Sequence, residues 1–106
     1  MGGYFDAAEK WLQLAETGYR ALAAQDPPAA RRATVIPVYR SVFARFHGEF
    51  TKAVALCQRA LTAAPDGEDR LKGVILLFLG QAYYFSGDLQ NAERALEEAI
   101  RYTLSS

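Results

Sequence analysis

Hydrophobic residues recur every three or four positions along almost the whole chain, and strict alternation of apolar and polar residues is nearly absent. Residues 4–25 hold one such stripe, formed by Leu12, Ala15, Tyr19 and Leu22. The helix-favouring residues Ala, Glu, Gln and Arg fill most of the remaining positions. This period is typical of amphipathic helices, so the pattern predicts an all-α protein.

Proline and glycine divide the pattern into about five helices. Asp26-Pro27-Pro28 ends the first, because the residue before a proline is disfavoured in the α region. Asp26 can cap a second helix that Pro27 opens and that runs toward Phe46, with Gly48 as its left-handed terminator. Pro37 lacks a backbone N–H, which predicts either a kink near this residue or a helix that restarts from Thr34.

Acidic residues and glycines bound the later helices. The third is expected from Glu49 to about Ala63. Asp66 or Asp69 can cap a fourth helix that runs through Phe85. Gly87 ends the fourth helix, and Asp88 opens a fifth that reaches about Leu104.

The chain contains an internal repeat. Sliding the sequence by 39 residues lays His47-Gly48-Glu49-Phe50 over Ser86-Gly87-Asp88-Leu89. It also lays Ala53, Cys57, Ala60 and Leu61 over Ala92, Leu96, Ala99 and Ile100. Small residues recur where two antiparallel helices would cross. We expect one domain made of a half unit (about 3–26), a unit (about 28–65) and a second unit (about 66–106).

Residues 73–106 resemble a tetratricopeptide repeat, a two-helix unit of about 34 residues. The family pattern W-x2-L-G-x2-Y, then A-x3-F, then P is matched by Leu76-x2-Leu79-Gly80-x2-Tyr83, then Ala92-x3-Leu96, then Leu104. Leucine replaces Trp, Phe and Pro, and the spacing is intact. The resemblance implies a right-handed superhelical stack of antiparallel helix pairs, an α-solenoid with a concave binding surface.

The whole chain, with its longer period, looks like the helical-repeat region of LuxR-type, MalT-like transcriptional activators. In that family the repeats lie between a nucleotide-binding domain and a helix-turn-helix domain. They receive inducers or regulatory proteins and contribute to self-assembly. Neither a G-x4-G-K-[ST] loop nor a basic recognition helix occurs here. We expect an excised piece of such a regulator or a short stand-alone relative. The alternative is a free-standing scaffold that binds a peptide or homodimerises through its apolar ends.

Composition narrows the classes of partner. Twelve basic residues balance twelve acidic ones, which argues against direct nucleic-acid binding by this chain. The single cysteine cannot form an internal disulfide, and the first residues lack the layout of a secretory signal. The longest apolar run, Val74–Leu79, is too short to span a membrane. These features favour a cytoplasmic protein.

Catalysis would have to use His47 and Cys57. Cys57 aligns with Leu96 on an apolar face, so we expect a buried packing residue. His47 precedes the helix-ending Gly48 and is expected in the last turn of the helix or in the turn itself, where the helix dipole favours it. Metal-ligand spacing, a nucleophile elbow and a second histidine are absent from the sequence. The sequence therefore predicts no enzyme, no cofactor and no metal site. Trp11 is expected to pack against the second helix.

The repeat pattern predicts a ligand or peptide groove. Leu76, Leu79 and Tyr83 should pack against their unit's own second helix, and Leu77, Gln81 and Tyr84 should face the hollow. The expected equivalents in the earlier unit are Val38, Val42 and Arg45, flanked by Tyr39 and Phe78. Tyr39, Arg45, Gln81 and Tyr84 offer the aromatic faces and polar donors that suit a small polar inducer or a peptide. The same side chains could instead contact further helices of a longer array.

Arg40 completes the predicted groove. It falls where the repeat normally places an apolar residue, so its charge requires a partner. Asp69, Glu68 or a ligand anion could supply one.

Overall fold

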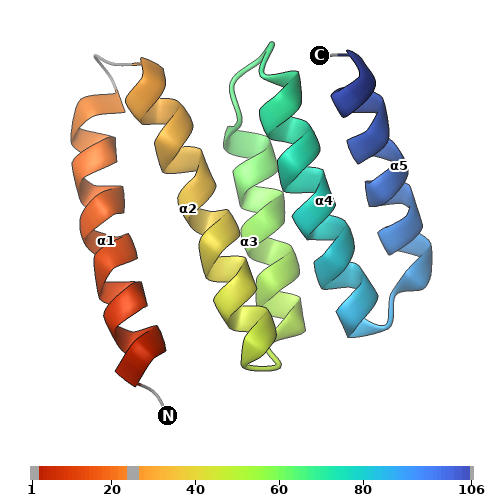
Figure 1. The fold of residues 1–106 in the computed structure, drawn as a ribbon, viewed down its shortest axis with the longest axis horizontal. Coiled ribbons are helices and arrows are strands. Elements are labelled where there is room, and N and C mark those ends of the chain that lie inside the picture. The colour runs from red at the N-terminus through yellow and green to blue at the C-terminus, as the bar shows by residue number, and fades with distance from the viewer. Residues whose placement is uncertain (1–2, 24–26, 106) are drawn as a thin grey trace.

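The computed structural model describes the backbone of residues 3–23 and 27–105, and the side chains of residues 6–15, 17 and 34–105. Five helices make up these ranges: α1 Gly3–Ala23, α2 Pro27–Phe46, α3 Phe50–Ala63, α4 Asp69–Ser86 and α5 Leu89–Ser105 (Figure 1). The predicted all-α solenoid is confirmed. Within the described ranges, every helix is too short or too polar to cross a membrane.

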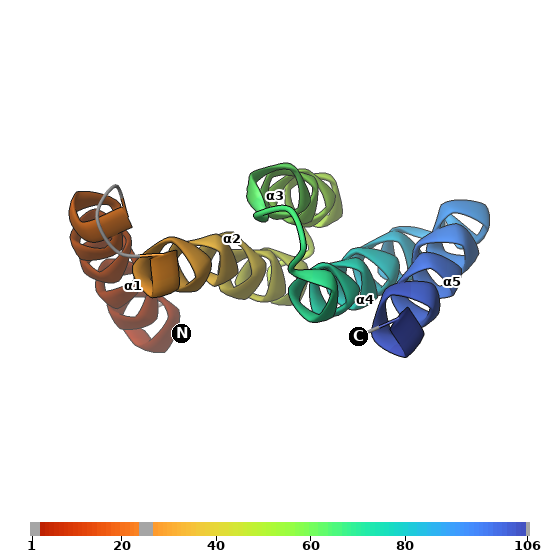
Figure 2. The ribbon, with the colours of Figure 1, turned by 90° about the horizontal axis from the view of Figure 1, so that it is seen from above.

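Successive helices run antiparallel and form a thin stack of 39 × 37 × 16 Å (Figure 1). Viewed from above, α2 and α4 lie side by side, α3 lies on one side of both (the upper side in Figure 2), and α1 and α5 stand at the two ends. α2 therefore contacts α1, α3 and α4, whereas α5 contacts only α4 among the described helices. The exposed side of the α2–α4 layer is one broad face of the molecule.

The two turns predicted to be equivalent share one geometry. Gly48 and Gly87 have φ angles of 76° and 90°, in the left-handed region that glycine adopts without steric cost. The residue after each glycine donates its N–H back into the preceding helix, Glu49 to Ala44 O at 2.8 Å and Asp88 to Tyr83 O at 2.9 Å. Both helices thus end in a Schellman turn, as the Gly-then-acid pattern predicts.

Only part of the predicted capping is observed. The Asp88 carboxylate accepts a hydrogen bond from the Asn91 N–H at 3.2 Å, which confirms the expected cap of α5. Glu68 occupies the cap position of α4 and makes no side-chain cap bond, so the predicted cap by Asp66 or Asp69 is wrong. Asp69 is already the first helical residue. The predicted cap by Asp26 lies outside the described residues.

Helix α2 runs without a break through Pro37, so the predicted restart from Thr34 is wrong. The residues on either side of the proline, Ile36 and Val38, are both buried. Packing of α2 against three neighbouring helices therefore outweighs the local cost of a missing N–H donor.

Small residues bring α4 and α5 together. A Cβ atom at Gly80 would lie 2.8 Å from Leu96 Cγ, so the two helices cross where no side chain intervenes. Leu76 and Leu79 are buried in this contact with Tyr83 packed beside them, which confirms their predicted packing against α5.

A second part of the core forms where α4 lies on α2 and α3. Val38, Ala60, Ala64 and Ile75 form the buried cluster. Val38 is only 1% exposed, so its predicted position in the hollow is wrong. The reason is that α4 covers this face of α2.

Trp11 is 62% exposed, and the prediction that it packs against α2 is wrong. Leu12 takes the buried position instead, because one residue along a helix turns the side chain by about 100°. The side chains of Tyr19 and Leu22, which were expected on the same stripe, lie outside the described residues.

Candidate functional site

Five residues form a continuous polar and aromatic cluster across the exposed side of α2 and α4. We call it the Arg45 cluster; its members are Arg45, Phe46, Gln81, Tyr84 and Phe85. Arg45 Nη1 donates a hydrogen bond to Gln81 Oε1 at 2.8 Å. The Arg45 guanidinium carbon lies 4.9 Å from the centroid of the Phe85 ring and 5.9 Å from that of Phe46. Tyr84 meets Phe85 edge to face, with ring centroids 5.5 Å apart.

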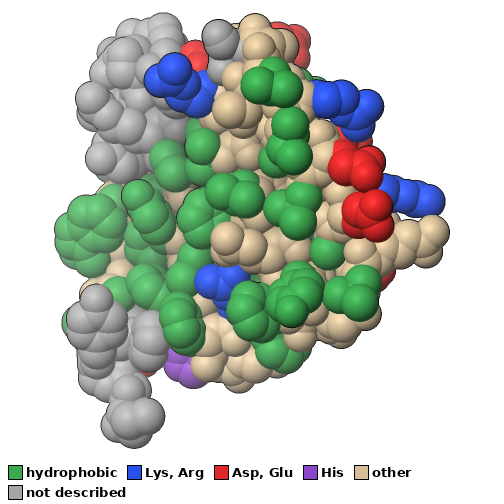
Figure 3. Space-filling model, turned by 45° about the vertical axis from the view of Figure 1, so that its right-hand side comes forward, with side chains coloured by type: hydrophobic (Ala, Val, Ile, Leu, Met, Phe, Trp, Pro, Cys, Tyr) green, Lys and Arg blue, Asp and Glu red, His purple; other side chains and the backbone are tan. Residues whose placement is uncertain are grey.

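The aromatic rings of this cluster face solvent. Phe46, Tyr84 and Phe85 are each more than half exposed, although aromatic side chains carry large apolar area. Tyr39 is also more than half exposed and lies on the same face of α2 as Phe46, about two helical turns earlier. Hydrophobic side chains cover much of the surface over α4, α5 and the adjoining part of α2, and most charged side chains there lie toward its edges (Figure 3).

Arg45 is the charged residue of the cluster and supplies hydrogen-bond donors. Its guanidinium carries several N–H donors in a planar fork, and the bond to Gln81 occupies one of them. Contact with the two phenylalanine rings holds the group in place through cation–π attraction. A fixed guanidinium beside exposed rings is suited to bind a carboxylate that lies next to an apolar group.

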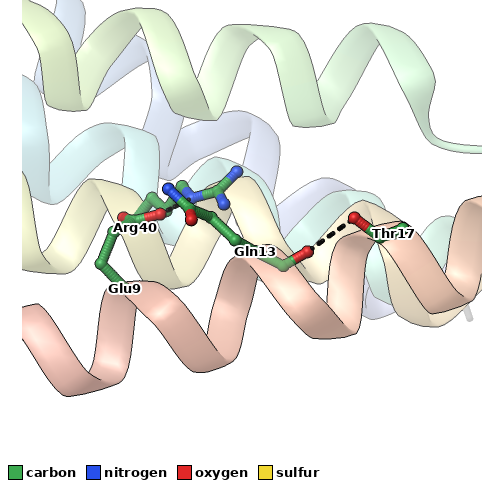
Figure 4. Close-up of polar contacts among 4 residues, drawn as sticks. All are labelled: Glu9, Gln13, Thr17 and Arg40. Atoms are coloured by element: carbon green, nitrogen blue, oxygen red, sulfur yellow. Dashed lines mark hydrogen bonds and ion pairs between the residues drawn. The ribbon is translucent and has the colours of Figure 1, made fainter.

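Arg40 lies on a different face. Its Nε atom donates to Glu9 Oε2 on α1 at 2.8 Å, while Gln13 and Thr17 follow along the same helix (Figure 4). The predicted partners Asp69 and Glu68 are therefore wrong. The reason is that α1 packs beside α2 and brings Glu9 to Arg40, whereas the two predicted acids belong to the start of α4.

The hollow next to Arg40 has a volume of about 510 Å³ and lies among α1, α2 and α3. Both signs of charge line it, including Asp6, Glu9, Arg40, Lys52 and Arg59. Such a mixture gives no net field for a ligand of one sign.

The structure thus divides the five predicted groove residues. Arg45, Gln81 and Tyr84 belong to one cluster, Tyr39 lies on the same face of α2, and Arg40 lies elsewhere. The sequence prediction missed Phe46 and Phe85. The 39-residue offset could have found them, because it lays one phenylalanine over the other, each two residues before a turn glycine.

Cys57 and His47 each form a hydrogen bond within the fold. Cys57 is fully buried, and its thiol donates to Ser41 Oγ at 3.2 Å, as expected for a packing cysteine. Burial raises the pKa of the Cys57 thiol, against smaller opposing effects of the Ser41 hydroxyl and the Arg45 charge. His47 is exposed and donates from Nδ1 to Phe43 O at 2.7 Å. Among the described residues, no three His, Cys, Asp or Glu side chains are grouped as a metal site would require.

Comparison with known proteins agrees with this architecture. The sequence matches the tetratricopeptide repeat family over residues 39–104, which is more than half of the chain. Neither a curated protein nor a solved structure gives a significant match. The matched segment begins within α2 and ends within α5, so it holds all of the Arg45 cluster. The chain belongs to the tetratricopeptide repeat family.

Proposed function

We propose that this chain is a protein-interaction module that binds a peptide segment of a partner protein on the α2–α4 face. The Arg45–Gln81 hydrogen bond carries the proposal, because it joins two helices of different units into one patch with exposed aromatic rings. Arginine and aromatic residues are the side chains that most often dominate binding energy at protein interfaces. Tetratricopeptide repeats typically mediate protein–protein interactions and are generally non-catalytic scaffolds.

The surroundings of the cluster favour a peptide over a small inducer. Small molecules bind in concave sites that enclose most of their surface. The Arg45 cluster lies on an open face, because Phe46, Tyr84 and Phe85 are each more than half exposed. We infer that the bound segment carries a carboxylate for Arg45, and beside it an aromatic or aliphatic side chain for Phe46 and Phe85.

The wider role that we propose is the sensor region of a MalT-like regulator, which receives a partner protein and couples that event to assembly. Its support is the resemblance over the whole chain. The coding sequence around this segment tests it. A phosphate-loop motif upstream and a helix-turn-helix downstream in the same reading frame would support a regulator. An open reading frame without either would leave the free-standing scaffold.

The binding face itself is tested with peptides selected by display on the wild-type protein. Arg45→Gln removes the charge and should weaken binding of these peptides about tenfold or more, since charge-assisted bonds in an interface contribute strongly. Arg94→Gln on the exposed side of α5 is the matched control and should leave the affinity within about twofold. Equal losses from both variants, or from neither, would contradict the proposed face.

A further inference from the structure

An apolar groove of about 410 Å³ lies between α4 and α5, apart from the Arg45 cluster. Its lining is Gly73, Val74, Leu77, Leu96, Ala99, Ile100, Thr103 and Leu104. Leu77 and Ile100 are 43% and 58% exposed, which is high for large aliphatic residues on facing helices. Among the described residues, no charged side chain lines this groove.

The same molecule contains a filled version of this groove. Shifting the eight lining residues back by 39 positions gives Thr34, Val35, Val38, Cys57, Ala60, Leu61, Ala64 and Pro65 on α2, α3 and the residues that follow α3. Leu77 thus corresponds to Val38, and Ile100 to Leu61. Val38 is 1% exposed and Leu61 is partly buried, because a helix covers them.

That covering helix is α4. Its Ile75, Leu71 and Phe78 pack on the cluster that Val38, Ala60 and Ala64 form. Positions 71, 75 and 78 follow the i, i+4, i+7 pattern of a single apolar stripe on a helix. The α2–α3 groove therefore shows that a surface of this kind binds an amphipathic helix. It also shows the direction of that helix, because α4 runs parallel to α2 and antiparallel to α3 (Figure 1).

We infer that the α4–α5 groove binds an amphipathic helix of a partner protein. The helix carries Leu, Ile or Phe side chains at i, i+4 and i+7, and it runs parallel to α4 and antiparallel to α5. Apolar side chains of this size fill the space between Leu77 and Ile100 as Ile75 fills the space beside Val38 and Ala60. This site is separate from the peptide site proposed above and does not depend on it.

A second copy of this chain that presents its α1 fits the groove less well. Among the described side chains of α1, the exposed large apolar ones are those of Trp11 and Leu14. An apolar stripe through these two residues would need a third large side chain at position 18, where the sequence has glycine. Two anchors would leave part of the groove in water. A partner helix with three anchors matches the filled groove.

The inference is tested with a soluble peptide of 18 residues, the length of α4. It keeps Leu71, Ile75, Phe78 and Ala82 and has Ala, Glu, Lys and Gln at the other positions. The control peptide replaces the three large apolar residues with Gln. We expect saturable binding of the first peptide by isothermal titration calorimetry, helix induction on binding, and no binding of the control.

Protein variants locate the binding site. Ile100→Glu should weaken peptide binding about tenfold or more, because it puts a charge into an apolar contact. Leu77→Glu repeats the test on the other helix, and circular dichroism shows that both variants are folded. Leu14→Glu, at another exposed leucine on α1, is the matched control and should change the affinity less than about twofold. Arg45→Gln should also leave helix binding unchanged, which separates this result from failure of the peptide site.

A spin label at the amino end of the peptide reports its direction. The inference predicts broadening of the Thr103 and Leu104 amide signals, because the corresponding end of α4 lies beside the carboxyl end of α3. Absence of binding, or binding that Ile100→Glu and Leu77→Glu leave intact, would overturn the inference. So would dimerisation of the wild-type protein that Ile100→Glu abolishes, since the occupant would then be a second copy.

Discussion

At the scale of single residues, Gly80 shows how closely the two helices of a unit approach. A Cβ atom there would lie 2.8 Å from both Cγ and Cδ2 of Leu96, which is too close for real contacts. The missing side chain is therefore part of the packing rather than a weakness of α4.

Gly80→Ala should lower the free energy of unfolding by about 1–3 kcal/mol, because overpacking exceeds the gain of about 1 kcal/mol in helix propensity. Urea unfolding followed by circular dichroism measures the change. In a Leu96→Ala background the same substitution should cost clearly less, since the clashing atoms are gone. A more stable Gly80→Ala protein would mean that α4 and α5 are not in this contact.

A second prediction at this scale concerns Cys57 and the pH dependence of stability. Burial raises the pKa of its thiol in the folded protein, so folding favours the protonated form. The stabilisation is complete below the pKa of the unfolded thiol and is lost as the pH rises through the folded pKa. Relative to Cys57→Ala, the wild-type protein should lose stability as the pH rises from the pKa of an ordinary thiol, about 8.5, toward the raised pKa of the folded state. Parallel pH profiles for the two proteins would show that the thiol does not titrate as a buried group.

At the scale of helices, the two Gly-then-acid turns have the same backbone geometry but differ in their caps. The Asp88 side chain bonds the Asn91 N–H, whereas Glu49 makes no side-chain cap bond. The shorter aspartate reaches the first turn of the helix, as is typical of capping residues.

Asp88→Ala should therefore lower the free energy of unfolding by about 1 kcal/mol, in the range measured for lost caps. Glu49→Ala is the control at the equivalent turn and should cost only a few tenths of a kcal/mol, because no cap bond is lost. Thermal unfolding of the two variants side by side gives the comparison. A larger loss for Glu49→Ala would contradict the assignment of the caps.

Local rules predicted much of this level of structure. Glycine followed by an acid specifies a helix end and a helix start within a few residues, so the sequence alone identified both turns. The restart from Thr34 was wrongly predicted because burial of Ile36 and Val38 on either side of Pro37 outweighs the local cost of the proline. The start of α4 was misplaced because several neighbouring acids could cap it, and the geometry of the preceding loop selects Glu68.

Part of the candidate site could also be predicted from the sequence, and part of it could not. Arg45, Gln81 and Tyr84 could be predicted because helical periodicity and the repeat place them on one exposed face. The partner of Arg40 could not, because it depends on how α1 packs beside α2, a contact between residues far apart in the sequence. The prediction for Val38 was wrong for a related reason. Whether the Val38 face of α2 is buried depends on where α4 packs.

At the scale of the whole molecule, the two recognition surfaces that we propose on the thin stack differ in their chemistry. The Arg45 cluster presents a cation among exposed rings on the α2–α4 face, and the α4–α5 groove presents only apolar and small side chains. A repeat stack exposes such surfaces because each unit contacts only its neighbours.

The most direct test of the central claim is a nuclear magnetic resonance titration of the isotope-labelled protein with a display-selected peptide. The account predicts that the largest chemical-shift changes occur at Arg45, Phe46, Gln81 and Tyr84. It also predicts that the Arg45→Gln substitution abolishes these changes. Changes centred instead on the hollow around Arg40 and Lys52, or spread evenly over all five helices, would contradict recognition by the α2–α4 face.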